Sequence, residues 1–157
     1  MSNKLLPGRN EIASIIPHSG AMVLVDQVLS CDTEKLVATV TLSPSSPLAF
    51  EGQLGGETLL EYAGQCTALH GALSSAPSNG DSDSIAARPA FISQTKALRW
   101  LPQLPDTTAE ITVNLEGQTA DGAIYRFRVI DLQHSQQQEL ASGTLSVIFS
   151  NIEPAGL

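Results

Sequence analysis

The side chains best able to exchange protons are one glutamate and one histidine that lie far apart in the 157-residue chain. Glu61 interrupts an apolar stretch of helical spacing, and His18 follows Pro17 near the start of the chain. A buried carboxyl group can donate a proton near neutral pH because burial raises its pKa, and an imidazole titrates in the same range. The two residues are therefore candidates for a general acid, Glu61, and a general base, His18.

Structural roles remain open for both residues. Glu57, Glu61 and Gln65 recur at four-residue spacing, which also fits the solvated face of a helix. His18 can instead cap the end of a helix or form a hydrogen bond across a turn.

Two adjacent glycines, Gly55 and Gly56, precede the apolar helical stretch. Free N–H groups at a helix start polarise a carbonyl oxygen, and glycine allows a ligand to approach the backbone closely. The pair is a candidate oxyanion site, and a flexible helix entry is the plainer interpretation. We interpret His70 as structural, near a helix end where a cation is favoured, because it lies more than two helical turns from Glu61. His134 falls in a polar turn and is expected to be solvated.

Hydrophobic periodicity predicts the elements that must position these residues. Asn10 is the expected N-cap of a first helix that ends at Pro17, and the polar segment 74–87 is expected to be a surface loop. The order of elements predicts a single α+β domain over residues 1–157, with one long helix on an antiparallel sheet. The expected helices cover 10–16 and 57–73, and the expected strands cover 22–29, 36–43, 89–101, 109–120, 123–132 and 139–150.

The composition excludes several classes of function. Sixteen acidic and eight basic residues give a net charge of -8, which leaves no basic surface for a nucleic-acid backbone. A local patch of Arg88, Lys96 and Arg99 can still steer an acidic carrier protein. Cys31 and Cys66 have no neighbouring soft ligands, so we expect reduced thiols and no metal site. Without a signal peptide or a long apolar span, the chain is expected to be cytoplasmic.

Three stretches resemble the hotdog-fold β-hydroxyacyl-acyl-carrier-protein dehydratases, in particular the dehydratase-like proteins of aryl-polyene and fatty-acid-like pathways. They are IIPHSGAMVLVDQVL, LLEYAGQCTALHG and FISQTKALRWLPQLPD, and the resemblance extends over roughly residues 11–149. The second stretch is the most specific, because it holds Glu61 at the family's catalytic position in the central helix. The chain departs from the family at residues 47–51, where Pro-Leu-Ala-Phe-Glu lacks the histidine of the usual Gly-His-Phe motif.

The resemblance implies a curled sheet around a central helix and dehydration of a 3-hydroxyacyl thioester to the trans-2-enoyl product. The substrate is expected on a carrier protein or coenzyme A, with Glu61 as acid, His18 as base and Gln65 and Trp100 as substrate-binding residues, Trp100 being otherwise a packing residue. The reaction requires no cofactor. The resemblance also implies a homodimer or a heterodimer with another hotdog subunit. An acyl thioesterase and a non-catalytic or half-catalytic dehydratase subunit remain as alternatives.

Overall fold

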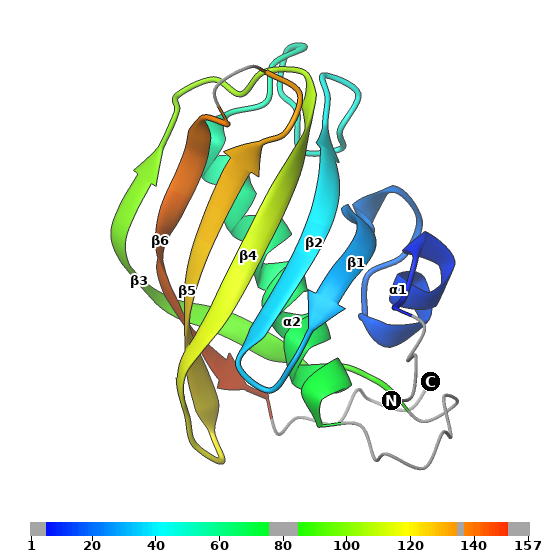
Figure 1. Cartoon of the computed structure of the whole chain (residues 1–157), viewed down its shortest axis with the longest axis vertical. Helices are drawn as coiled ribbons and strands as arrows, with labels where there is room; N and C mark the ends of the chain where they lie inside the picture. Colours follow the sequence, from blue (N-terminus) through cyan, green and yellow to red (C-terminus); the bar gives the residue numbers. More distant parts are fainter. Residues whose placement is uncertain (1–5, 76–84, 135–136, 151–157) are drawn as a thin grey trace.

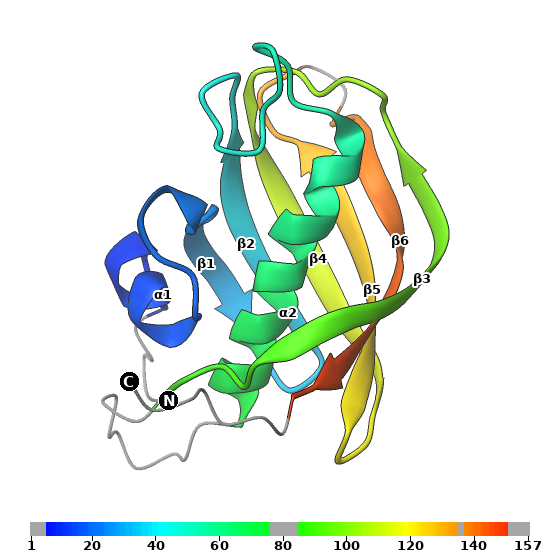
Figure 2. The same cartoon turned by 180° about the vertical axis from the view of Figure 1, so that it is seen from behind.

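A computed structural model describes residues 6–75, 85–134 and 137–150 of the chain. A six-stranded antiparallel sheet curls around one long helix, and a short helix packs beside the first strand (Figures 1 and 2). The helical elements are α1 (Arg9–Ile15), η1 (Gly20–Met22), η2 (Gly56–Thr58) and α2 (Leu59–Ser74). The strands are β1 (Val25–Cys31), β2 (Lys35–Leu42), β3 (Ala90–Trp100), β4 (Thr107–Gln118), β5 (Gly122–Asp131) and β6 (Glu139–Phe149).

The strands lie in the order β1-β2-β4-β5-β6-β3, and every pairing is antiparallel. β3 is the next strand after α2 in the chain, but it joins the sheet beyond β6, at the edge opposite β1, and Figure 2 shows it passing in front of the lower part of the helix. The two predicted α-helices and six strands are confirmed, although α1 begins one residue earlier than expected and its N-cap is Gly8, not Asn10. The first strand begins at Val25 rather than at Met22, which lies in a 3-10 helix.

Alternation of side chains explains why the sheet has one buried face. On β2, Leu36, Ala38, Val40 and Leu42 are fully buried, while the residues between them are partly or fully exposed. β4 and β5 continue the pattern, and their inward side chains contact α2 with those of β2. Because neighbouring side chains on a strand point to opposite faces, this pattern fixes which face of the curl meets the helix.

α2 is buried on most of its circumference, as its near-continuous apolar sequence predicts. Its one partly exposed stripe runs along the length of the helix and carries mainly small or polar side chains. Small side chains along this stripe leave space beside the helix that the sheet does not fill. The stripe is formed by Glu61, Gly64, Ala68 and Gly71 and continues to Ser75, the residue after the helix.

β3 forms an exposed edge of the sheet. No other strand of the described residues pairs with its outer side, and nearly every residue of the strand is exposed. Its apolar side chains Phe91, Ile92 and Trp100 are 66%, 40% and 43% exposed. An unpaired edge with apolar side chains is a surface on which a second chain can add. No helix of the described residues is long and apolar enough to cross a membrane.

Candidate active site

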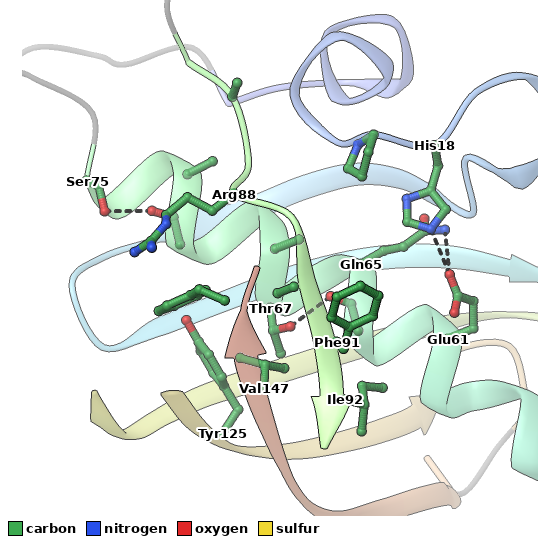
Figure 3. A pocket seen from close by; sticks show the side chains of 18 of the residues that line it. His18, Glu61, Gln65, Thr67, Ser75, Arg88, Phe91, Ile92, Tyr125 and Val147 are labelled. Atoms are coloured by element: carbon green, nitrogen blue, oxygen red, sulfur yellow. Dashed lines mark hydrogen bonds and ion pairs between the residues drawn. The ribbon is translucent and has the colours of Figure 1, made fainter. Parts of the chain in front are cut away.

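A cavity of about 520 Å³ follows the open stripe of α2. The helix forms one wall, the segment before β3 and the first residues of β3 form another, and Pro17 and His18 close one end (Figure 3). Apolar side chains line most of it, and the ionisable side chains at its ends are His18 and Glu61 at one end and Arg88 toward the other. An elongated, mainly apolar cavity with a few polar groups is typical of a small-molecule site.

The structure brings His18 and Glu61 together. The distance between His18 Nε2 and Glu61 Oε1 is 2.9 Å, within hydrogen-bond range. Their side chains are 30% and 40% exposed, so the cavity end is open to solvent in the single chain. An imidazole and a carboxyl group in direct contact can pass a proton between them, and each can also exchange one with a molecule in the cavity.

Gln65 fixes the distance between these two residues. Its Nε2 donates to the Met22 carbonyl oxygen at 2.7 Å and to Glu61 Oε1 at 3.4 Å, and its Oε1 accepts a hydrogen bond from the Leu24 amide at 3.0 Å. Because Gln65 is 1% exposed and lies one turn after Glu61, it ties the segment that follows His18 to the central helix. The amide was expected to bind substrate, and in the structure protein groups occupy both of its ends.

A second anchor holds the His18 segment from the side of α1. Arg9 pairs with Asp26 at 2.9 Å and donates to the Val23 carbonyl oxygen at 2.7 Å, and Asp26 also accepts a hydrogen bond from Thr41 at 2.7 Å. These contacts join α1, β1 and β2 around the loop that carries His18. Asp26, an unexpected charge within a strand, therefore has a structural role.

Two atoms of the pair bear on its chemistry. Glu61 Oε1 contacts both His18 and Gln65, while Oε2 has no hydrogen-bond partner among the described residues. Nδ1 of His18 is buried, again with no partner in that part of the chain. The ring therefore exchanges protons through Nε2, and Glu61 keeps one oxygen free for a second contact.

Three predicted substrate-binding residues lie away from the cavity of this chain. The N–H of Gly56 donates to the Pro102 carbonyl oxygen at 3.4 Å and is not the free donor that we expected. A Cβ at Gly56 would overlap the Leu101 carbonyl oxygen and the Trp100 side chain, so glycine is needed there for close packing. Trp100 is half-exposed beside Gly56, and neither these two residues nor Gly55 lines the cavity.

His70 is structural, as expected, but it is neutral rather than a cation at the helix end. It is fully buried, and burial lowers its pKa more than hydrogen bonding to the Asp32 backbone and the charge of Asp32 raise it. Since the Asp32 carbonyl oxygen can only accept, His70 Nε2 donates to it at 2.9 Å, and Nδ1 accepts from the Tyr125 hydroxyl at 2.8 Å.

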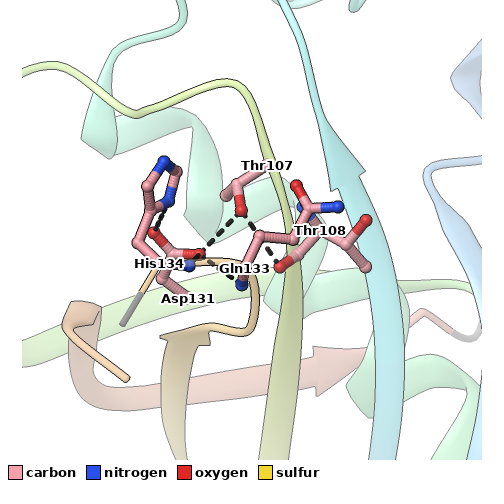
Figure 4. A network of polar contacts seen from close by, with 5 residues as sticks. All are labelled: Thr107, Thr108, Asp131, Gln133 and His134. Atoms are coloured by element: carbon pink, nitrogen blue, oxygen red, sulfur yellow. Dashed lines mark hydrogen bonds and ion pairs between the residues drawn. The ribbon is translucent and has the colours of Figure 1, made fainter. Parts of the chain in front are cut away.

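His134 belongs to a separate cluster at the turn after β5 (Figure 4). Its Nδ1 lies 2.5 Å from Asp131 Oδ2. Burial raises the pKa of Asp131. Hydrogen bonds from Thr107, from the backbone of Gln133 and from His134 lower the pKa by more than burial raises it, so the net shift is downward. The His134 side chain is 60% exposed, as the polar turn predicted, and the cluster caps the turn.

Other titratable groups add no second centre of chemistry. Burial raises the pKa of Cys66 to about 12, so this thiol stays protonated and unreactive. Within the described ranges, no group of three His, Cys, Asp or Glu side chains is placed to hold a metal ion.

The sequence did not identify the far end of the cavity. Arg88 was considered only as part of a surface patch, and Phe149 and Tyr125 were not considered at all, although all three line the cavity. The Arg88 guanidinium lies 4.3 Å above the Phe149 ring, which is a cation–π contact. Alternation within β5 and β6 indicates which side chains point inward but not which of them meet along the helix.

Comparison with known proteins identifies the family. The model of the ApeP-like family, described as ApeP dehydratase, matches residues 10–155, so the chain belongs to this family of dehydratases. No curated protein matches the sequence.

Solved structures show the same fold. The dehydratase heterocomplex ApeI:P from Xenorhabdus doucetiae is similar over 90% of this chain and 91% of that chain, with 20% identity and a TM-score of 0.72. A hypothetical thioesterase with coenzyme A from Streptococcus pneumoniae is similar over 78% and 84%, with 13% identity and a TM-score of 0.54. The E. coli PaaI protein of the phenylacetic acid degradation operon is similar over 81% and 80%, with 15% identity and a TM-score of 0.54.

The fold and the family membership together define the class of protein. The curled sheet around α2 is a hotdog fold, and the protein is a hydro-lyase that dehydrates a 3-hydroxyacyl thioester to the trans-2-enoyl thioester. The resemblance to dehydratases of the aryl-polyene type is confirmed.

Proposed function

We propose that dehydration takes place at the His18–Glu61 pair, with the substrate carried as a thioester on a phosphopantetheine thiol. The observation that carries this proposal is the 2.9 Å contact between His18 Nε2 and Glu61 Oε1 at the end of an elongated cavity. Elimination of water from a 3-hydroxyacyl thioester needs a base for the α-proton and an acid for the departing hydroxyl group. This pair supplies both groups within one chain.

In the proposed step, neutral His18 removes a proton from the α-carbon through Nε2, and protonated Glu61 donates its proton to the β-hydroxyl group. The C–H electron pair forms the α,β double bond, the C–O bond breaks, and water leaves. The site then holds an imidazolium and a carboxylate. A neutral imidazole has a single lone pair, so Nε2 can take the α-proton only when it is not in contact with Glu61. The substrate therefore enters between the two groups and opens their contact, with the α-carbon toward His18 and the β-hydroxyl group toward Glu61.

The direct contact also restores the catalyst. After elimination, His18 carries the extra proton and Glu61 lacks one. Once the product has left, His18 Nε2 and Glu61 Oε1 return to the 2.9 Å contact seen in the ligand-free chain. A single proton transfer along this hydrogen bond returns both groups to their starting forms. No proton from solvent is needed, so the balance of each turnover is one hydroxyacyl thioester converted to one enoyl thioester and one water.

A second hotdog subunit, identical or different, completes the proposed enzyme. The exposed apolar edge of β3 lies beside the cavity, since Phe91 and Ile92 belong to both. A subunit added at this edge would cover the side chains of His18 and Glu61, which are 30% and 40% exposed in the single chain, and would exclude water from them. The structural likeness to a dehydratase heterocomplex supports a hetero-pair.

The test is a comparison of substrates rather than a single assay. The purified chain, alone and mixed with a hotdog subunit encoded beside it, is assayed with hydroxyacyl, enoyl and saturated acyl thioesters. We expect interconversion of hydroxyacyl and enoyl thioesters and no release of free thiol. Light scattering should give at least twice the 16.5 kDa chain mass. Thiol release from the saturated thioester would support the thioesterase alternative, and activity only with a partner whose own acid is intact would support a half-catalytic role.

A further inference from the structure

The far end of the cavity carries a cation without a counter-ion. Arg88 contacts the Phe149 ring, and no carboxylate of the described residues pairs with it. Of the other four arginines, Arg9, Arg126 and Arg128 each pair with an acid, and Arg99 does not line the cavity. In a chain of net charge -8, an unpaired guanidinium that lines a cavity favours an anionic ligand.

Arg88 is also held in place. The amide of Ala87 donates to the Ile15 carbonyl oxygen at 2.8 Å, and the carbonyl oxygen of Pro89 accepts from the Ser150 amide at 2.7 Å. The backbone on both sides of Arg88 is therefore tied to α1 and to the end of β6, and the Phe149 ring supports the guanidinium. A cation whose backbone is fixed loses less entropy on binding an anion than one on a free loop.

The spacing between Arg88 and the acid–base pair matches a particular ligand. Figure 3 shows Arg88 near Ser75, and His18 and Glu61 at the opposite end of the cavity. The helix between Glu61 and Ser75 spans about 20 Å at the α-helical rise. A phosphopantetheine arm has about fourteen bonds between its thioester carbon and its phosphorus, which corresponds to roughly 16 Å at the bond spacing of an extended chain.

We propose that this cavity holds the phosphopantetheine arm along α2, with Arg88 binding its phosphate and the thioester lying at His18 and Glu61. The proposal rests on the proposed function, because that function places the thioester at the pair. The acyl tail then points away from Arg88. Arg88 is exposed in the single chain, and an acyl tail beside it would remove part of its water without supplying an anion, whereas a phosphate supplies one.

The experiment measures binding, so its result does not depend on turnover. Calorimetry compares 4′-phosphopantetheine with pantetheine, which lacks the phosphate, on the full-length chain. We expect the phosphate to strengthen binding roughly 10- to 100-fold, the range for a charge-assisted hydrogen bond, and Arg88→Gln to remove this difference. Arg88→Lys should retain part of it, because lysine keeps the charge but not the planar fork of donors.

Arg126→Gln is the matched control, since Arg126 is an exposed arginine outside the cavity and pairs with Glu116. It should leave the phosphate preference unchanged. Equal affinity for the two ligands, no measurable binding of either, or a preference that survives in Arg88→Gln would overturn the assignment. A phosphate preference lost in Arg88→Gln, in a chain that dehydrates no thioester, would uphold the Arg88 assignment while the proposed function fails.

A second experiment distinguishes whether coenzyme A or a carrier protein supplies the phosphopantetheine arm. Hydroxyacyl thioesters of coenzyme A and of a holo carrier protein share the same phosphate, so Arg88→Gln should raise KM for both by a similar factor. If the wild-type chain uses only the carrier-protein thioester, the arm comes from a carrier protein. A KM that rises for neither substrate would contradict the assignment.

Discussion

Two histidine–carboxylate contacts in this molecule have similar distances, but they differ in their access to a cavity and in the hydrogen bonds that their carboxylates already accept. His18 and Glu61 come from separate elements and meet at 2.9 Å at the end of a 520 Å³ cavity. His134 and Asp131 come from one turn and meet at 2.5 Å. Glu61 keeps an oxygen without a protein partner, whereas both oxygens of Asp131 accept hydrogen bonds.

The difference teaches what to look for in such pairs. Asp131 is 1% exposed and is saturated by a threonine hydroxyl, two backbone amides and an imidazole, so it stabilises a turn and has no capacity left for a ligand. Glu61 is only partly enclosed and lies against a cavity that a ligand can enter. A short contact between an imidazole and a carboxylate therefore marks chemistry only when one of the two groups remains incompletely paired.

The largest expected effect separates the two acids. Glu61→Gln should reduce dehydration by on the order of 10²-fold or more, because the amide cannot donate an acidic proton, and it should leave the melting temperature unchanged. The matched control is Asp131→Asn, which keeps a carbonyl oxygen for Thr107 and the two amides. Retained activity in a folded Glu61→Gln protein, with the rate measured under saturating substrate, would remove Glu61 from the mechanism.

The second prediction separates the two histidines. His18→Ala should abolish most turnover while binding of a non-reactive hydroxyacyl thioester analogue stays nearly unchanged, since a base acts in the transition state. His134→Ala should retain full turnover per folded molecule. The readouts are kcat, analogue affinity and the melting temperature. Loss of activity that only follows loss of folded His18→Ala protein would indicate a structural cap instead of a base.

The third prediction concerns stability, for which Asp131 should matter more than Glu61. Asp131→Ala should lower the free energy of unfolding by about 1–3 kcal/mol, because it leaves the buried Thr107 hydroxyl and neighbouring amides without their acceptor. Glu61→Ala should lower the free energy of unfolding by less. The hydrogen bond from Gln65 Nε2 to Glu61 is long, 3.4 Å, and the same amide keeps its shorter bond to the Met22 carbonyl oxygen. Urea denaturation measures both. An Asp131→Ala protein as stable as the wild type would show that the cluster does not hold the turn.

Periodicity in the sequence was enough to predict both α-helices and all six strands of the described residues, but not the 3-10 helix Gly20–Met22, and the reason is physical. Strands with one buried face must alternate, and the buried helix α2 must be apolar on nearly all sides. The adjacency of β3 and β6 was not predicted, because pairing across the sheet depends on which edges remain free after the local hairpins form. The N-cap of α1 was misplaced because Asn10 is a common capping residue and Gly8 is a neutral one.

Only part of the candidate site could be predicted from the sequence. The resemblance pointed to His18 and Glu61, but the role of Gln65 depends on the carbonyl oxygen of Met22 and the amide of Leu24, whose positions follow from the folded loop. Gly56 was misinterpreted for a similar reason. Its small size serves the close approach of Leu101, which no local pattern reveals.

The smallest effect concerns His70, the one histidine that contacts no carboxylate group. Its pKa lies below the ordinary value of 6.5, chiefly because burial disfavours the imidazolium. Above pH 6.5 both the folded and unfolded forms are neutral and the stability is complete. Below it the unfolded chain binds a proton that the folded chain refuses, so stability falls until the pH reaches the lowered folded pKa.

This acid sensitivity must be separated from any pH dependence of catalysis at His18. We expect the melting temperature to fall as the pH is lowered from 7.5 to 5.5, and His70→Gln to reduce that fall, since glutamine does not titrate but can still form hydrogen bonds with Tyr125 and Asp32. The pH profile of kcat should be the same in both proteins wherever they are folded. An equally steep fall in His70→Gln would place the acid-sensitive group elsewhere, and a shifted kcat profile would mean that His70 and its Tyr125 partner act on the cavity after all.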